Sequence, residues 1–206
     1  MAAGKSTAAD LGAYICFEDE AGQGLRPPKG HTWASRGKRP VVCVRGSNRG
    51  RVNIAGVLCF RAGERSHFFY KLHIWHGRKR EWKAFTWQEY RDLIVLTHRQ
   101  LGAPLVWCWD NLNVHLARQL ADFARENEAW LRVFQMPSYA PDLNPAEWVW
   151  SLFKRSIADF AAADLKHLVR VTKRKLKKIQ YRPHLIDSCL AATGLAIEPP
   201  DNASST

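Results

Sequence analysis

The chain has 206 residues, with 46% hydrophobic and 11% aromatic side chains, which indicates one globular domain, with or without an appendage. There are 31 Lys and Arg against 19 Asp and Glu, for a net charge of +12. This charge attracts polyanions and makes nucleic acid the first candidate partner, although a basic protein of ribosomal type fits the composition equally well.

Cysteine usage and hydropathy exclude further classes of protein. The five cysteines form no CxxC pair, which argues against a zinc site and against a secreted disulfide framework. Buried free thiols are the expected alternative. The sequence shows neither a signal-peptide core nor an apolar run of transmembrane length, so we expect a cytoplasmic protein without a membrane partner.

The first half of the chain is rich in strand signals. Buried strands are expected at residues 13–18, 41–45, 51–60 and 66–74. The segment 22–40 is turn-rich and basic, and predicts an extended loop. Residues 1–12 are typical of a linker or disordered N-terminus and 198–206 of a disordered tail, which leaves residues 13–197 as one domain.

Helices and strands alternate in the second half. A capping box at Thr86–Glu89 predicts a helix that ends before Gly102. Strands are expected at 105–110 and 131–136, and helices at 115–128 and 164–181. A further helix is expected to begin at Pro145, with Asn144 as its N-cap and Trp148 facing inward. Strands that are grouped first and alternate with helices later predict an α/β fold with a mixed sheet flanked by helices.

Three carboxylates stand where these elements are expected to end or begin. Asp19 follows the first strand, Asp110 ends the strand at 105–110, and Glu147 opens the helix after the last strand. Ends of neighbouring strands converge on one crevice, and three carboxylates there repel one another unless a cation lies between them. Oxygen ligands suit Mg²⁺ or Mn²⁺, and a pair of such ions can act on a phosphodiester.

Each acid also has a structural interpretation. Asp19 can be a solvated strand end, Asp110 can serve the turn that it begins with Asn111, and Glu147 can complete a capping box with Asn144. For Glu147 alone, the cap is the favoured interpretation. A cap explains one acid, however, and not three at matching positions.

Three segments that carry these acids resemble the catalytic blocks of DDE transposases, nearest the bacterial insertion-sequence branch of the mariner superfamily. The segments are CFEDEAG, VWCWDNLNVH and PSYAPDLNPAEWVWSLFKR. Positions 111–146 place 36 residues between Asp110 and Glu147, near the usual interval of that superfamily. The resemblance extends from about Tyr14 to Leu195 and implies a ribonuclease-H-like fold with a five-stranded mixed sheet.

The resemblance also implies an activity and its cofactors. Asp19, Asp110 and Glu147 would be the catalytic residues and would bind two Mg²⁺, for which Mn²⁺ can substitute. The reaction would be hydrolytic nicking at transposon ends, followed by attack of the freed 3′-hydroxyl on target DNA. Alternatives are a ribonuclease-H-like nuclease without strand transfer and a domesticated, inactive DNA-binding module.

Neighbouring residues and partners follow from the same resemblance. His115, Asn111, Asn144 and Glu20 are candidates for active-site support, with His115 either contacting the scissile phosphate or orienting Asp110. The chain would act as a homodimer on DNA, and in a bacterial cytoplasm it would associate with the nucleoid. Only about a dozen residues precede the first strand, so an end-reading helix-turn-helix region is expected either in a missing N-terminal domain or on a separate chain.

Basic residues are the remaining candidates for DNA contact. They lie in the loop after the first strand and on one face of the helix at 164–181, where the alternative is an ordinary solvated face. Phosphate contacts of this kind give an affinity that falls steeply with salt. The candidate DNA-binding residues are Arg26, Lys29, Trp33, Arg36, Lys38, Arg39, Lys166, Arg170, Lys173, Arg174 and Lys177.

Overall fold

A computed structural model describes residues 2–26, 36–37, 50–110, 112, 114–137, 141–158 and 160–197 of the chain. Its helices are α1 (Ala2–Leu11), α2 (Trp87–Leu101), α3 (Arg118–Glu126), α4 (Pro145–Ser156), α5 (Leu165–Gln180) and α6 (Pro183–Ala191), with a short 3-10 helix η1 (Pro141–Leu143). Its strands are β1 (Tyr14–Gly24), β2 (Arg51–Phe60), β3 (His67–Trp75), β4 (Leu105–Trp109) and β5 (Leu131–Gln135).

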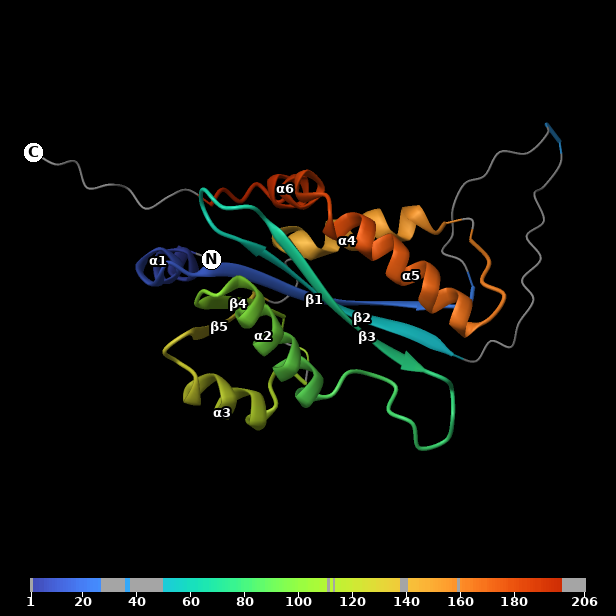
Figure 1. Cartoon of the computed structure of the whole chain (residues 1–206), viewed down its shortest axis with the longest axis horizontal. Helices are drawn as coiled ribbons and strands as arrows, with labels where there is room; N and C mark the ends of the chain where they lie inside the picture. Colours follow the sequence, from blue (N-terminus) through green and yellow to red (C-terminus); the bar gives the residue numbers. More distant parts are fainter. Residues whose placement is uncertain are drawn as a thin grey trace, which may run out of the picture.

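The five strands form one mixed sheet in the order β3-β2-β1-β4-β5 (Figure 1). β1, β2 and β3 pair antiparallel, whereas β4 runs parallel to β1 and to β5. The expected mixed sheet is therefore confirmed. β1 is the central strand, so both of its faces are buried for most of its length. Its first residues are therefore consecutive apolar residues, without the alternation of polar and apolar residues that a half-exposed strand shows.

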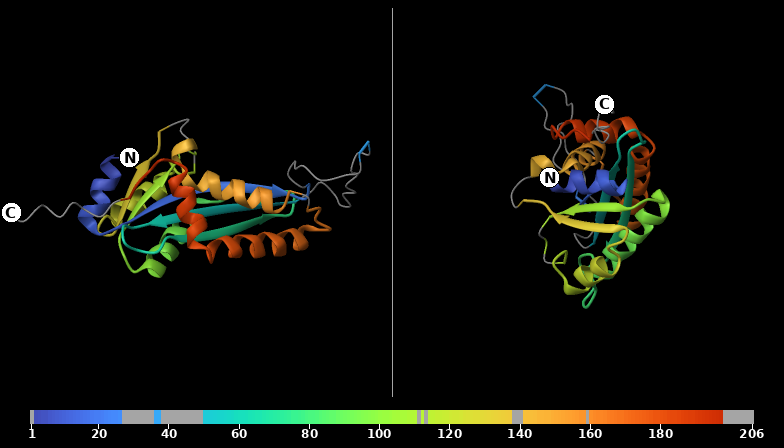
Figure 2. Two further views of the ribbon diagram at one scale, coloured as in Figure 1. Left: turned by 90° about the horizontal axis from the view of Figure 1, so that it is seen from above. Right: turned by 90° about the vertical axis from the view of Figure 1, so that its left-hand side faces the viewer.

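Helices cover both faces of this sheet (Figures 1 and 2). On one face α4 packs against β1 and β2, and α5 packs against β2 and β3. α1 and α6 contribute to the same core, which contains Ile15, Phe17 and Trp150. On the other face α2 and α3 enclose a second core around Tyr90 and Trp107. β1 supplies both cores, because alternate side chains of a strand point to opposite faces.

Local sequence signals place several boundaries. Thr86 and Glu89 form the expected capping box at the start of α2, and Gly102 ends that helix in the left-handed conformation. The bounds of β2 are those predicted. Asp164 caps α5 by accepting a hydrogen bond from the backbone N–H of His167.

Other expectations require correction. Residues 2–11 are a helix and not a linker, because this alanine-rich segment packs against β1 and β4. α3 begins at Arg118 and not near His115, because residues 114–116 form a turn that directs His115 inward. α6, which begins at Pro183, is not among the elements expected from the sequence. The strand expected at 41–45 and the tail at 198–206 lie outside the described residues.

The cysteines have the expected state in the part of the chain that the structure describes. Cys16, Cys59, Cys108 and Cys189 are buried free thiols, and the fifth cysteine lies outside the described residues. Among the helices described, none combines the length and the apolar character needed to cross a bilayer.

Candidate active site

Asp19 lies in the middle of β1 and not at its end, contrary to our expectation. β1 continues to Gly24 because β2 pairs with it along its whole length, with Asp19 opposite Gly56. On the other side of β1, the pairing with β4 stops at Phe17 and Cys108. Asp19 therefore sits two residues beyond the point at which this edge of β1 becomes free of the parallel neighbour.

Asp110 follows directly after β4. The parallel register pairs Phe17 with Cys108, so continuing it by two positions places Asp110 beside Asp19. Asp110 lies just beyond the last residue of β4, and its Oδ1 atom is 3.0 Å from Nδ1 of His115, which packs on the α2 side of the sheet. The same Oδ1 atom accepts a hydrogen bond from the backbone N–H of Leu112, with an N···O distance of 3.1 Å. β1 and β4 thus bring the first two acids together.

Glu147 lies in the first turn of α4, and it is not a capping residue. Asn144 alone caps this helix, by accepting a hydrogen bond from the N–H of Ala146 at 3.1 Å, and Pro145 occupies the first helical position. The Glu147 side chain is exposed and has neither a hydrogen bond nor an ion pair within the described part of the chain. The cap leaves this carboxylate available for other chemistry.

The three acids share one electrostatic field. Burial raises the pKa of Asp19 to about 7, and the negative charge of Glu147 adds to the rise, with a smaller contribution from Asp110. Hydrogen bonds from the Glu20 backbone and the Trp150 indole oppose this rise without cancelling it. Asp19 is therefore a half-buried carboxylate whose charged form is disfavoured by burial and by the neighbouring negative charges.

This arrangement fits a divalent cation by charge and donor type. Within the described ranges no three His, Cys, Asp or Glu side chains meet closely enough to hold one ion. The donors are nevertheless all carboxylate oxygens, which Mg²⁺ and Mn²⁺ prefer. A cation would relieve the repulsion that raises the Asp19 pKa.

Trp150 and Gly56 hold Asp19 in place, and neither was identified from the sequence. The Trp150 indole donates a hydrogen bond from Nε1 to Oδ2 of Asp19 at 3.0 Å. Its ring lies against Gly56, where an added Cβ would be only 2.5 Å from Cη2 of Trp150. A glycine inside a strand often marks a close approach of this kind, so the signal was present in the sequence.

The inward tryptophan of α4 is therefore Trp150 and not Trp148. Trp148 is 42% exposed, whereas Trp150 is 1% exposed. The buried residues of α4 include Ala146, Val149 and Phe153. Their spacing of three to four places Trp150 on the inner stripe and leaves Trp148 outside it.

Gly56→Ala is expected to destabilise the protein by about 2 kcal/mol, because the new methyl group overpacks a rigid indole. The displaced indole would also lose its hydrogen bond to Asp19. Urea unfolding measures the first effect, and the metal dependence of activity measures the second. Gly24→Ala, in the adjacent strand and with no atom within 4 Å of the added carbon, is the matched control. An equal loss in both variants would contradict this assignment.

His115 contacts Asp110 from the opposite side of the sheet. Its Nδ1 atom lies 3.0 Å from Oδ1 and 3.1 Å from the backbone oxygen of Asp110, so Nδ1 carries a proton that it donates to these oxygens. The imidazole stacks on Trp109 with centroids 4.4 Å apart and meets the edge of Tyr90 at 4.7 Å. Because the ring is buried, this geometry supports the orientation of Asp110 and not contact with a phosphate.

Glu18 and Glu20 lie on that second face. Nε2 of His115 is 3.3 Å from Oε2 of Glu18, but the two groups are not aligned as a hydrogen bond. Burial, followed by the charge of Asp19, raises the pKa of Glu18 well above its usual value, so this carboxyl group stays protonated. Burial and Asp110 raise the pKa of Glu20 to about 6. Among the expected supporting residues, Asn111 lies outside the described ranges.

The expected DNA-binding residues divide into two groups. On α5 the five candidates Lys166, Arg170, Lys173, Arg174 and Lys177 are exposed and none forms an ion pair with another described residue. Their spacing of three to four places them along one side of the helix. In the loop after β1, Arg26 and Arg36 are exposed. The remaining loop candidates lie outside the described residues; they are Lys29, Trp33, Lys38 and Arg39.

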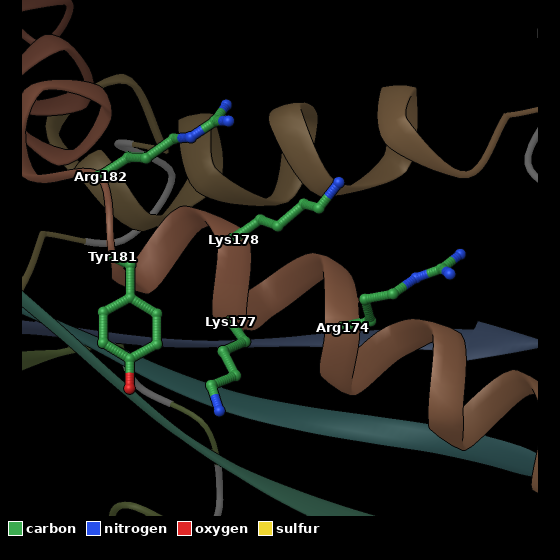
Figure 3. A pocket seen from close by; sticks show the side chains of 5 residues that line it. All are labelled: Arg174, Lys177, Lys178, Tyr181 and Arg182. Carbon is green, nitrogen blue, oxygen red and sulfur yellow. The ribbon is translucent and has the colours of Figure 1, made fainter.

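A shallow hollow marks the C-terminal end of this helix. It is lined by Arg174, Lys177, Lys178, Tyr181 and Arg182 (Figure 3). The Lys177 ammonium lies 5.6 Å from the centre of the exposed Tyr181 ring. Figure 3 shows the side chains of Arg174 and Lys178 extending away from the helix on one side. The basic side of α5 thus continues onto the turn before α6.

Comparison with known proteins identifies the family. The profile described as DDE superfamily endonuclease matches residues 14–169. The chain belongs to this family. The matched segment contains all three acids, although the match by itself assigns none of them a role. A search of curated proteins returns no match to the chain.

Solved structures show the same fold. The DDE domain described here aligns with a pre-cleavage Mos1 transpososome at a TM-score of 0.58 and 14% identity, covering 94% of this chain and 60% of that one. The Mos1 strand transfer complex aligns at a TM-score of 0.55 and 16% identity, covering 89% of this chain and 56% of that one. The Mos1 transposase catalytic domain with Raltegravir and Mg aligns at a TM-score of 0.53 and 14% identity, covering 96% of this chain and 92% of that one. The expected ribonuclease-H-like fold is confirmed, and this chain spans little more than half the length of the Mos1 chains in the two complexes.

Proposed function

We propose that this chain is the metal-dependent catalytic domain of a DNA transposase, from the bacterial insertion-sequence branch of the mariner superfamily. The observation that most supports this is that, in a chain of the DDE family, the negative charges of Glu147 and Asp110 both act on the carboxylate of Asp19. Residues 13–197 would form the catalytic unit. The family match and the likeness of fold support this proposal.

The proposed reaction has two steps. The first is hydrolysis of a phosphodiester at a transposon end, and the second is transfer of the freed 3′-hydroxyl to target DNA. Two Mg²⁺ or Mn²⁺ ions, when bound by the three acids, would neutralise the scissile phosphate and activate the attacking oxygen. The chain's own structure contributes orientation: Trp150 holds Asp19, His115 holds Asp110, and the capped start of α4 holds Glu147.

The proposed partners are transposon-end DNA, target DNA and a second copy of the chain on DNA. Solved complexes of Mos1 include a paired-end complex with a left transposon end, which supports a paired assembly here. Recognition of the end sequence is assigned to a helix-turn-helix region outside this catalytic unit. In a bacterial cell the assembly would be cytoplasmic and associated with the nucleoid.

One assay tests this proposal against its alternatives. A labelled transposon-end duplex and a supercoiled target plasmid are incubated with the protein and either Mg²⁺, Mn²⁺ or EDTA. Joined product that depends on metal supports transposition. Nicks without joining support a nuclease instead, and DNA binding without nicks or joining supports an inactive module. The last two results reject the proposed function.

The α5 candidates yield a quantitative prediction about DNA binding. Lys173→Gln with Lys177→Gln is expected to weaken binding of a duplex about 10-fold at physiological salt. Loss of two phosphate contacts should also reduce the slope of log K against log salt by about 2. Fluorescence anisotropy at several salt concentrations measures both quantities.

The matched control removes two charges from the other side of the molecule. Arg99→Gln with Arg118→Gln leaves the same net charge but changes α2 and α3, where both side chains are exposed. We expect this pair to alter affinity less than twofold. If both pairs of substitutions weaken binding equally, overall charge and not the α5 surface determines the affinity.

A further inference from the structure

The loop that joins β3 to α2 presents an exposed tryptophan. Trp82 is 76% exposed, and the loop projects to one side of the sheet before it returns to α2 (Figure 1). The neighbouring Arg78, Lys79, Arg80 and Lys83 are also exposed. None of these four cations forms an ion pair within the described residues. This loop is distinct from every DNA-binding candidate that the sequence suggested.

The first half of the loop is organised by one carboxylate. Glu81 accepts hydrogen bonds from the backbone N–H groups of His76 and Arg78, at 2.8 and 3.1 Å. Its other oxygen lies 2.7 Å from Nδ1 of His76. The acid is thus occupied by the loop itself, and it leaves the surrounding cations unpaired.

The second half is attached to the sheet at two consecutive carbonyl groups. Asn53 donates from Nδ2 to the backbone oxygen of Lys83 at 2.5 Å, and His73 donates from Nε2 to the backbone oxygen of Trp82 at 2.8 Å. Asn53 and His73 are paired across β2 and β3. Nδ1 of His73 also lies 3.0 Å from the capping-box carboxylate of Glu89. The backbone at Trp82 is therefore fixed on a rigid base.

A tryptophan held outward in this way favours a planar ligand. A base stacks on an aromatic ring, and nearby cations neutralise the phosphates on either side of it. A base within a duplex is already stacked on its neighbours, so an exposed indole of this kind suits an unpaired base. The excess of cations on the loop also matches DNA better than an average protein surface.

The loop is close enough to the acids to serve the same DNA molecule. Asn53, which holds the loop, pairs with Gly22 on β1, three residues or about 10 Å along the strand from Asp19. Asp19 faces the α4 side of the sheet with Trp150, whereas Asn53 lies on the α2 side with Ala55 and Val57. A DNA strand at the acids would therefore reach this loop by passing the edge of β1 that β4 leaves free.

We propose that Trp82 stacks on an unpaired base of the DNA whose phosphodiester lies at Asp19, Asp110 and Glu147. This rests on the proposed function for the identity of the ligand. It does not depend on whether the DNA is cut. The loop would thereby hold a frayed or single-stranded segment next to the site.

The test uses DNA with 2-aminopurine at single positions in an unpaired extension, bound to the full chain in EDTA. We expect the fluorescence at one position to be quenched on binding, and Trp82→Ala to abolish that quenching and weaken binding of the extended DNA about 10-fold. Trp82→Phe should retain part of both effects. Binding of a fully paired duplex should be unchanged, and the unfolding temperature of each variant confirms that it is folded.

Leu96→Ala is the matched control, because Leu96 is also a large exposed apolar residue, at 45% exposure, and it lies on α2 outside every proposed DNA contact. If Trp82→Ala behaves like this control or like the wild type, the proposal is wrong. It is also wrong if Trp82→Ala alters sedimentation of the free protein but not the quenching, since Trp82 would then mark a protein interface. Failure of wild-type nicking in Mg²⁺ would reject the proposed function alone, because the stacking measurement contains no metal.

Discussion

Glu147→Gln is expected to reduce metal-dependent nicking of DNA by about 1,000-fold. The change removes one negative oxygen ligand from a site whose ions stabilise the transition state by several kcal/mol, and a loss of roughly 4 kcal/mol corresponds to this factor. The side chain is exposed and has no hydrogen bond within the described chain, so its replacement should not disturb the fold. Single-turnover nicking in Mg²⁺ measures the effect.

Binding and stability distinguish this result from misfolding. DNA affinity in EDTA and the unfolding temperature should both match the wild type, since α4 keeps its Asn144 cap and its inner stripe. Glu126→Gln, an equal change at the exposed end of α3, should retain full activity. Wild-type nicking by Glu147→Gln would remove Glu147 from the proposed site.

Local chemistry predicted much of this fold. The capping box before α2, the Asn-Pro start of α4 and the long apolar run of β2 each depend on residues close in sequence. Such signals place an element to within a few residues whatever its neighbours are. The positions of Asp110 and Glu147 along the chain could be predicted for the same reason, because each lies next to the end or the start of an element.

Features that depend on distant contacts could not be predicted in this way. β1 extends past Asp19 only because β2 pairs with it to Gly24, and a short polar stretch gives little sign of this. Two tryptophans, Trp148 and Trp150, lie in the first turns of α4, and the sequence alone does not show which of them faces the sheet. Trp150 does so because its ring packs against Gly56 on β2. The held position of Trp82 likewise depends on Asn53 and His73, which lie on two other elements.

The metal-free protein is expected to lose stability as the pH rises from about 5 to about 8. The pKa of Asp19 is raised to about 7 and that of Glu20 to about 6, and the pKa of Glu18 is raised as well. Above the unfolded values near 4, the folded state therefore binds more protons than the unfolded state, so the free energy of unfolding falls with pH. Burial lowers the pKa of His115, so the unfolded state binds more protons at this residue. This opposes the fall in the free energy of unfolding only below the unfolded histidine pKa of about 6.5.

We expect a loss on the order of 3 kcal/mol, since each pKa unit is worth about 1.4 kcal/mol. Urea unfolding in EDTA at several pH values measures it. Asp19→Asn should flatten the curve, because the asparagine cannot ionise beside Glu147. At about pH 8, millimolar Mg²⁺ should restore stability to the wild type by binding the folded state, and should do so far less in Asp19→Asn. A wild-type stability that rises across this range in EDTA would show that the three acids do not repel one another, and the argument for a shared cation would be lost.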